Sequence, residues 1–125
     1  MNHMYREILS APELLEGTIC ENTQRVEALA KALKEKAYPT VHIAARGSSA
    51  NAGLYFAYAC EILAGLPVHM LMPSVLTVYD GRLCFGDGLL LAITQGGRGS
   101  DIRFLMDAAK AQGCHTAAIC NEEDS

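Results

Sequence analysis

Residues 41–53 read VHIAARGSSANAG, and residues 89–101 read LLLAITQGGRGSD. In each stretch a short apolar run stops at small polar residues, after which a helical pattern begins. This arrangement is typical of the carboxyl ends of strands in a parallel α/β sheet, where such folds bind their ligands. Backbone N–H groups at the start of a helix lack partners and carry partial positive charge, so they favour an anion. The two junctions therefore predict a site for a small phosphorylated molecule.

The composition predicts a folded domain with its own core. Of the 125 residues, 50% are apolar and 19% are charged, and the net charge of −4 argues against a nucleic-acid partner. The five cysteines and four histidines show no metal-binding spacing, so we expect no metal, no cofactor and free thiols in a reducing, cytoplasmic compartment. No stretch approaches the roughly 20 apolar residues of a membrane span, and residues 1–7 do not resemble a signal peptide. We expect no membrane partner.

Hydrophobic periodicity and capping residues predict the order of helices and strands. We expect a first helix from Ser10 to about Ala37, with Ser10 as its cap and Pro12 in its first turn. Further elements are expected as helices at 50–64 and 100–112, strands at 41–45, 67–71, 89–94 and 115–120, and one helical turn at 75–79. Such alternation implies parallel strands with right-handed crossovers. The expected fold class is α/β, a three-layer α-β-α sandwich with a parallel, flavodoxin-like sheet, preceded by an N-terminal helix.

Two segments are expected along the chain. Residues 1–38 form an N-terminal helical segment that packs on the domain, and residues 39–125 form the domain itself. The fourth strand is followed directly by the residues NEEDS at 121–125. Because a sheet of this type normally continues, we expect the domain to be incomplete at its C-terminus.

Several nucleotide-binding motifs are absent from the sequence. It contains no Gly-x-x-x-x-Gly-Lys-Ser/Thr motif, which excludes a P-loop NTPase, and Ile102 breaks the dinucleotide fingerprint that Gly97 and Gly99 would begin. The sequence pattern also gives no support for a Ser-His-Asp or Cys-His catalytic unit. Glycine-rich turns after strands also serve packing alone, so a purely structural role for the two loops remains an alternative at this point.

Residues 45–53 and 93–101 resemble the two ligand loops of the sugar isomerase (SIS) domain family. Within that family they resemble the isomerase half of glutamine–fructose-6-phosphate aminotransferases and the related glucosamine-6-phosphate deaminases. Residues 5–12, 73–79 and 118–121 also resemble segments of that isomerase half, in the same order. The resemblance implies a small-molecule sugar phosphate as ligand, with fructose-6-phosphate and glucosamine-6-phosphate as examples.

The resemblance also implies which residues bind the ligand. The first loop offers Gly47, Ser48 and Ser49 to the sugar phosphate. In the second loop hydroxyl groups bind the phosphate and a glutamine contacts the sugar; the matching positions are Thr94, Gln95, Gly96, Gly97, Arg98 and Gly99, followed by Ser100. Gly96 and Gly99 replace two hydroxyl residues, and each lost hydrogen bond weakens binding by roughly 1.5–3 kcal/mol. Closer backbone approach, Ser100, Arg98 and Arg46 are expected to offset part of this loss.

Catalysis by such a family requires a base beside the substrate carbonyl. In the resembling enzymes that glutamate, with a helping histidine and lysine, lies in the second half, beyond position 125, so the catalytic residues here are unknown. The ionisable residues of this chain are interpreted as surface, turn or structural groups: His42, Glu61, His69, Asp80, Asp87, Asp101 and His115. We expect the chain alone to bind its ligand without catalysing a reaction.

The apolar residues of the first helix are expected to form a hydrophobic surface that another domain or chain buries. A homodimer or a second SIS domain is the expected partner. Two other functions remain open from the sequence. One is a non-catalytic sugar-phosphate sensor or regulatory domain, and the other is a degenerate, truncated SIS protein that folds but binds nothing.

Overall fold

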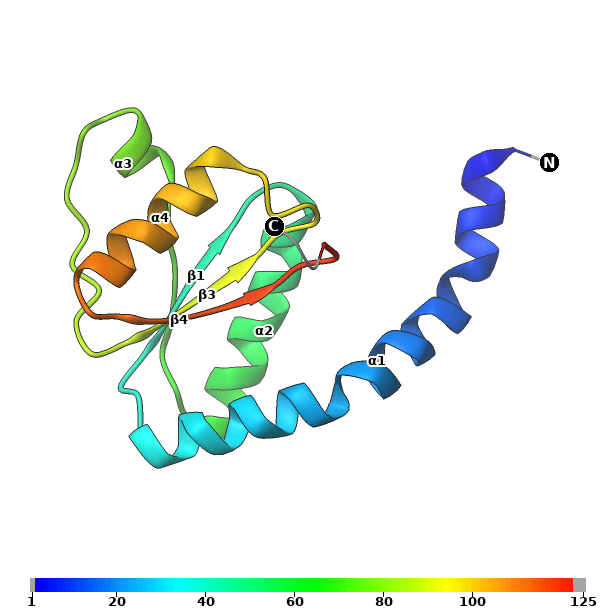
Figure 1. Ribbon diagram of the computed structural model, residues 1–125, viewed down its shortest axis with the longest axis horizontal. Coiled ribbons are helices and arrows are strands. Elements are labelled where there is room, and N and C mark those ends of the chain that lie inside the picture. Colours follow the sequence, from blue (N-terminus) through cyan, green and yellow to red (C-terminus); the bar gives the residue numbers. More distant parts are fainter. Residues whose placement is uncertain (1, 123–125) are drawn as a thin grey trace. The chain divides into compact units, whose positions relative to one another are not determined.

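The computed structural model describes residues 2–122, except for the side chain of Ala32. The chain divides into two compact units, Met1–Ala37 and Tyr38–Ser125, and each is described by itself (Figure 1). Among the described residues, none of the helices combines the length and the apolar character that a membrane crossing needs.

The first unit is one long helix, α1 (His3–Lys36). The start predicted at Ser10 is wrong: the Ser10 hydroxyl donates to the Glu7 carbonyl at 3.1 Å, and Pro12 lies inside the helix. Residues 3–9 contain no helix breaker, so the helix extends back through them, although the proline removes one backbone hydrogen bond and its ring crowds the carbonyl of Ile8. Figure 1 shows α1 bending towards its N-terminal end, as a proline within a helix favours.

The second unit is built on a four-stranded parallel sheet in the order β2-β1-β3-β4. The strands are β1 (Val41–Ala45), β2 (Val68–Met70), β3 (Leu89–Ile93) and β4 (His115–Ile119). The central pair, β1 and β3, is in register from Val41 opposite Leu89 to Ala45 opposite Ile93. This order is the one found in flavodoxin-like folds, and the expected α/β class with a parallel sheet is confirmed.

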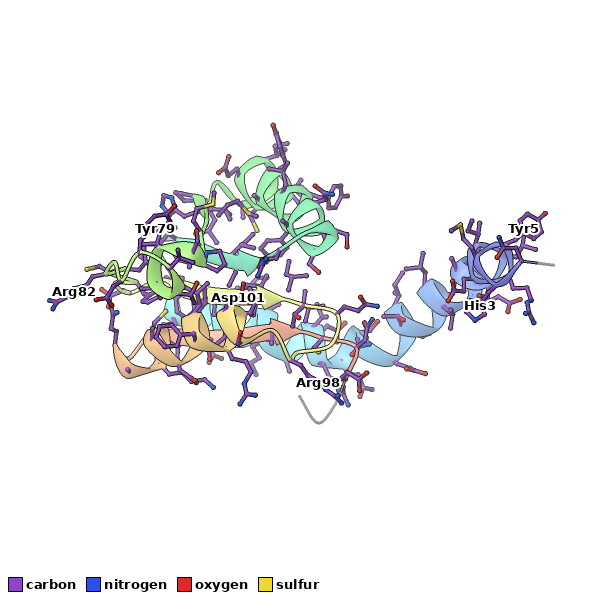
Figure 2. All side chains as sticks on the ribbon, turned by 90° about the horizontal axis from the view of Figure 1, so that it is seen from above. His3, Tyr5, Tyr79, Arg82, Arg98 and Asp101 are labelled. Atoms are coloured by element: carbon purple, nitrogen blue, oxygen red, sulfur yellow. The ribbon has the colours of Figure 1, made fainter. Side chains whose placement is uncertain are left out.

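Helices cover both faces of the sheet. Figure 2 shows α2 (Ser48–Ala64) on one side, and α4 (Ser100–Ala111) on the other. The single-turn helix α3 (Ser74–Thr77) contacts α4. Side chains on a strand alternate between the two faces. Ile43 accordingly meets α2, whereas Ala44 belongs to the same buried cluster as Leu105 of α4.

Gly53 brings α2 close to the sheet. A Cβ atom at this position would lie 2.9 Å from Ile43 Cγ2 and 3.3 Å from Met70 Cε, so any larger residue would force the helix outward. The close packing fixes the first turn of α2 over the carboxyl end of β1. The first predicted ligand loop lies at that end.

The loop before β3 is anchored by its backbone. Phe85 is 2% exposed, and its N–H donates to Gln112 Oε1 at 3.3 Å, while Gln112 Nε2 donates to the Leu83 carbonyl at 2.8 Å. The Phe85 carbonyl accepts a hydrogen bond from His42 Nε2 at 3.0 Å. His42 therefore has a structural role in the core, beneath the loop that leads into β3.

Candidate functional site

The two predicted ligand loops meet at one open depression of about 510 Å³. They do so because they follow β1 and β3, which are paired along their whole length. Eight of the predicted positions line the depression: Gly47, Ser48, Ser49, Thr94, Gln95, Gly96, Arg98 and Gly99. Gly97 instead lines a neighbouring depression of about 250 Å³, and Ser100, the exposed first residue of α4, lines neither of them.

The first loop turns sharply into α2. Gly47 has φ 55° and ψ −132°, a conformation that glycine adopts far more readily than other residues, and its carbonyl accepts the Ala50 N–H at 3.1 Å. No side chain at the N-cap position accepts a hydrogen bond from the first turn of α2. The Ser48 and Ser49 N–H groups, at the start of this turn, are therefore the ones available to an anion in the depression.

The second loop is held in place by the end of β4. The Thr94 N–H donates to the Ile119 carbonyl at 3.0 Å, and the Asn121 N–H donates to the Gln95 carbonyl at 3.1 Å. Gly97 takes a positive φ of 62°, and a Cβ atom on Gly96 would meet nothing within 4 Å. A side chain at position 96 would thus have room, although the sequence places none there.

An ion pair connects the two loops across the depression. Arg46 Nη1 donates to Asp101 Oδ2 at 2.5 Å, with the Arg46 side chain 70% exposed and that of Asp101 15% exposed. The sequence predicted a contribution of Arg46 to phosphate binding and a surface, turn or structural role for Asp101, but it did not predict their contact. The two residues are 55 positions apart, and no local pattern links them.

The pKa of Asp101 reflects its surroundings. Burial raises this pKa, but the hydrogen bond from Arg46, the backbone N–H groups of Ile102 and of Asp101 itself, and the charge of Arg46 together lower it below the usual value. The carboxylate is therefore ionised at neutral pH and is a poor general base, because a base works best with a pKa near the operating pH.

None of the other ionisable groups singled out by the sequence is among the described residues that line the depression, and four of them contact residues elsewhere. Glu61 Oε1 accepts the N–H of Val68 in β2 at 3.4 Å, and His115 Nδ1 lies 2.6 Å from the Tyr38 hydroxyl. His42 stacks on His69, with ring centroids 5.7 Å apart. Within residues 2–122 no group of three or more His, Cys, Asp or Glu side chains is placed to hold a metal ion.

Comparison with known proteins identifies homologues of this chain. No protein-family model matches the chain. A glutamine–fructose-6-phosphate aminotransferase of Thermus thermophilus is 31% identical over 127 aligned positions that cover 99% of this chain. A protein of Silicibacter pomeroyi DSS-3, assigned as a phosphosugar isomerase, superposes on the whole chain with a TM-score of 0.93 and 37% identity. The chain is homologous to the SIS region of these proteins.

A second solved structure agrees with this homology. The C-terminal domain of the glucosamine–fructose-6-phosphate aminotransferase of Francisella tularensis matches 98% of the SIS homologue with a TM-score of 0.78 and 29% identity. The SIS homologue spans about a fifth of the length of the curated relatives it matches, 21% for the Thermus enzyme. It covers 38% of the Silicibacter chain and 35% of the Francisella chain.

Proposed function

We propose that this SIS homologue binds a sugar phosphate, with fructose-6-phosphate and glucosamine-6-phosphate as the first candidates. The observation that carries the proposal is the convergence of the loops after β1 and β3 on one depression. Hydroxyl groups and the start of α2 line it, and both attract anions. The names of the homologues, an aminotransferase of fructose-6-phosphate and a phosphosugar isomerase, support the same ligand class.

Each part of the depression has a distinct role in this proposal. The first turn of α2, with Ser48 and Ser49, binds the phosphate together with the Thr94 hydroxyl. Gln95 contacts the sugar, because its amide both donates and accepts hydrogen bonds, as sugar hydroxyl groups require. Arg98 lies at the outer edge of the second loop (Figure 2) and contributes positive charge at the rim.

Binding without catalysis is the activity proposed for this chain alone. Among the described residues that line the depression, Asp101 is the one carboxylate, and its lowered pKa makes it a weak base. A sugar-phosphate sensor needs nothing more than this site. An isomerase, aminotransferase or deaminase would use the same site with a base supplied by another segment or subunit.

A thermal melt with and without ligand tests the proposed site. Fructose-6-phosphate is expected to raise the melting temperature in a saturable way, because a ligand that binds only the folded state stabilises it. Ser49→Ala should weaken this binding by roughly 1.5–3 kcal/mol, or about ten- to a hundredfold in Kd, the usual value of a hydrogen bond to a charged group. Unphosphorylated fructose should produce no shift.

Ser10→Ala is the matched control, because Ser10 lies in α1 and its hydroxyl donates to the Glu7 carbonyl of the same helix. This variant should respond to fructose-6-phosphate as the unchanged protein does. A cooperative melt that fructose-6-phosphate, glucosamine-6-phosphate and inorganic phosphate all leave unmoved would instead support the degenerate protein that binds nothing.

We further propose that a second copy of the chain covers the apolar residues of α1. Alternating spacings of three and four along α1, as in a coiled coil, connect six apolar residues when Pro12 and Asn22 are counted at the two positions between them. All six are at least 41% exposed: Tyr5, Ile8, Leu15, Ile19, Val26 and Leu29. Asn22 interrupts the series, as a polar residue that fixes the register of paired helices often does. An apolar stripe of this length is unfavourable in water unless it is covered.

Light scattering coupled to gel filtration tests the pairing of α1. The unchanged protein is expected to have the mass of a dimer, and Ile19→Lys is expected to have that of a monomer because it places a charge in the apolar stripe. Glu27→Lys, on the same helix but outside the stripe, should remain dimeric. A monomeric unchanged protein would contradict the proposal.

A further inference from the structure

The depression is lined by a negatively charged side chain of the protein itself, that of Asp101. The Asp101 side chain is 15% exposed, accepts a hydrogen bond from Arg46 Nη1 at 2.5 Å and is stabilised by the backbone N–H of Ile102 in the first turn of α4. These are the donors that a phosphate would use at this end of the site. The role proposed below for Asp101 in ligand selectivity rests on the proposed sugar-phosphate function.

Gly99 explains how the carboxylate fits into this position. A Cβ atom at position 99 would lie 3.2 Å from Asp101 Oδ1, a distance tighter than most contacts of real Cβ atoms. The space that a side chain at 99 would enter is thus next to the Asp101 carboxylate. Gly99, which replaces a hydroxyl residue of the resembling proteins, therefore lies directly beside the Arg46–Asp101 pair.

Arg46 is held by Asp101 but retains further donors. A guanidinium carries several N–H groups, and the described bond to Asp101 uses Nη1. The ion pair also borders another depression, of about 280 Å³, which is distinct from the one that Gly97 lines. The α3 residues Ser74 and Thr77 are part of its lining. Movement of Arg46 away from Asp101 would therefore change both depressions.

We propose that Asp101 sets the charge selectivity of the site, and that Arg46 transfers its hydrogen bond from Asp101 to the ligand phosphate on binding. A phosphate dianion attracts a guanidinium more strongly than a single carboxylate does, and it offers paired oxygens for a bidentate bond. An anion with one charge gains too little to displace Asp101. The pair thus favours phosphorylated sugars over sugar acids, which carry one carboxylate.

Calorimetric titration with inorganic phosphate, fructose-6-phosphate and gluconate tests this exchange. Asp101→Asn, which keeps the shape but removes the charge, should tighten phosphate binding about tenfold and should allow gluconate to bind. Asp107→Asn removes the same charge from an exposed position of α4 outside the main depression, and it should change each Kd by less than about twofold.

The double variant Arg46→Gln/Asp101→Asn separates the exchange from simple repulsion. If Arg46 is the group that changes partner, the gain from Asp101→Asn should disappear when Arg46 is absent. An equal gain in both backgrounds would overturn the exchange and assign the effect to repulsion by Asp101. Unchanged phosphate binding in Asp101→Asn, with fructose-6-phosphate still bound, would overturn the selectivity role while leaving the sugar-phosphate site intact. Failure of all these proteins to bind any phosphate would overturn both proposals.

Discussion

Phe85→Ala is expected to lower the free energy of unfolding by about 3–5 kcal/mol, the range found when a buried aromatic side chain is removed. Phe85 is among the largest fully buried side chains, and it packs in one cluster with Leu90 and Leu105. Its ring also meets the edge of His42 at a centroid distance of 5.9 Å. The alanine variant would leave a cavity between the sheet and α4, and the anchored loop would not collapse to fill it.

Urea unfolding measured by circular dichroism checks this loss of stability. Phe104→Ala is the matched control, since Phe104 lies on α4 and is 54% exposed. Its loss should cost about 1 kcal/mol or less, as is usual for exposed positions. Equal losses in the two variants would contradict the placement of Phe85 at the centre of the core.

Gly47→Ala is expected to cost about 1–3 kcal/mol of stability and to weaken phosphate binding at least tenfold, because it strains the turn that aims α2 at the ligand. The cost arises from the backbone alone. A Cβ atom at position 47 would meet nothing within 4 Å, but the φ of 55° is one that residues with a side chain rarely adopt. Relief of the strain would rotate the first turn of α2 and misdirect its N–H groups.

Gly96→Ala separates backbone strain from the effect of an added methyl group. Position 96 lies in the second loop of the same depression, a Cβ atom there also meets nothing within 4 Å, and its φ is not positive. The melting temperature of this variant should match that of the unchanged protein, whereas that of Gly47→Ala should be lower. If both alanine variants bind phosphate normally, the conformation of Gly47 does not position the site.

Much of the sheet could be predicted because its strands are short and sharply bounded. The run at 41–45 lies between Pro39 and Gly47, and the run at 89–93 follows a glycine. Continuous apolar residues between such breakers indicate buried parallel strands. The start of α1 was predicted wrongly because Ser10 and Pro12 form a plausible cap, and local signals do not reveal that the helix continues through it.

The convergence of the two loops could also be predicted, because parallel neighbouring strands end at the same edge of the sheet. The Arg46–Asp101 pair could not. Sequence shows two opposite charges near two loops, but their contact depends on how α4 is rotated about its axis after residue 99. That rotation also places Asp101 in the depression and Ser100 outside it. It is set by the packing of Ile102 and Leu105 in the core.

The pairing of β1 with β3 determines how far apart the two ligand loops lie. Ala45 and Ile93 are the last paired residues, and both ligand loops begin directly after them. The spacing between the loops is therefore set by backbone hydrogen bonds that side-chain changes barely alter. A redesign for a bulkier ligand would succeed by lengthening the segment 95–99 and would fail by altering the strands. Ligand size in this scaffold is a property of loop length.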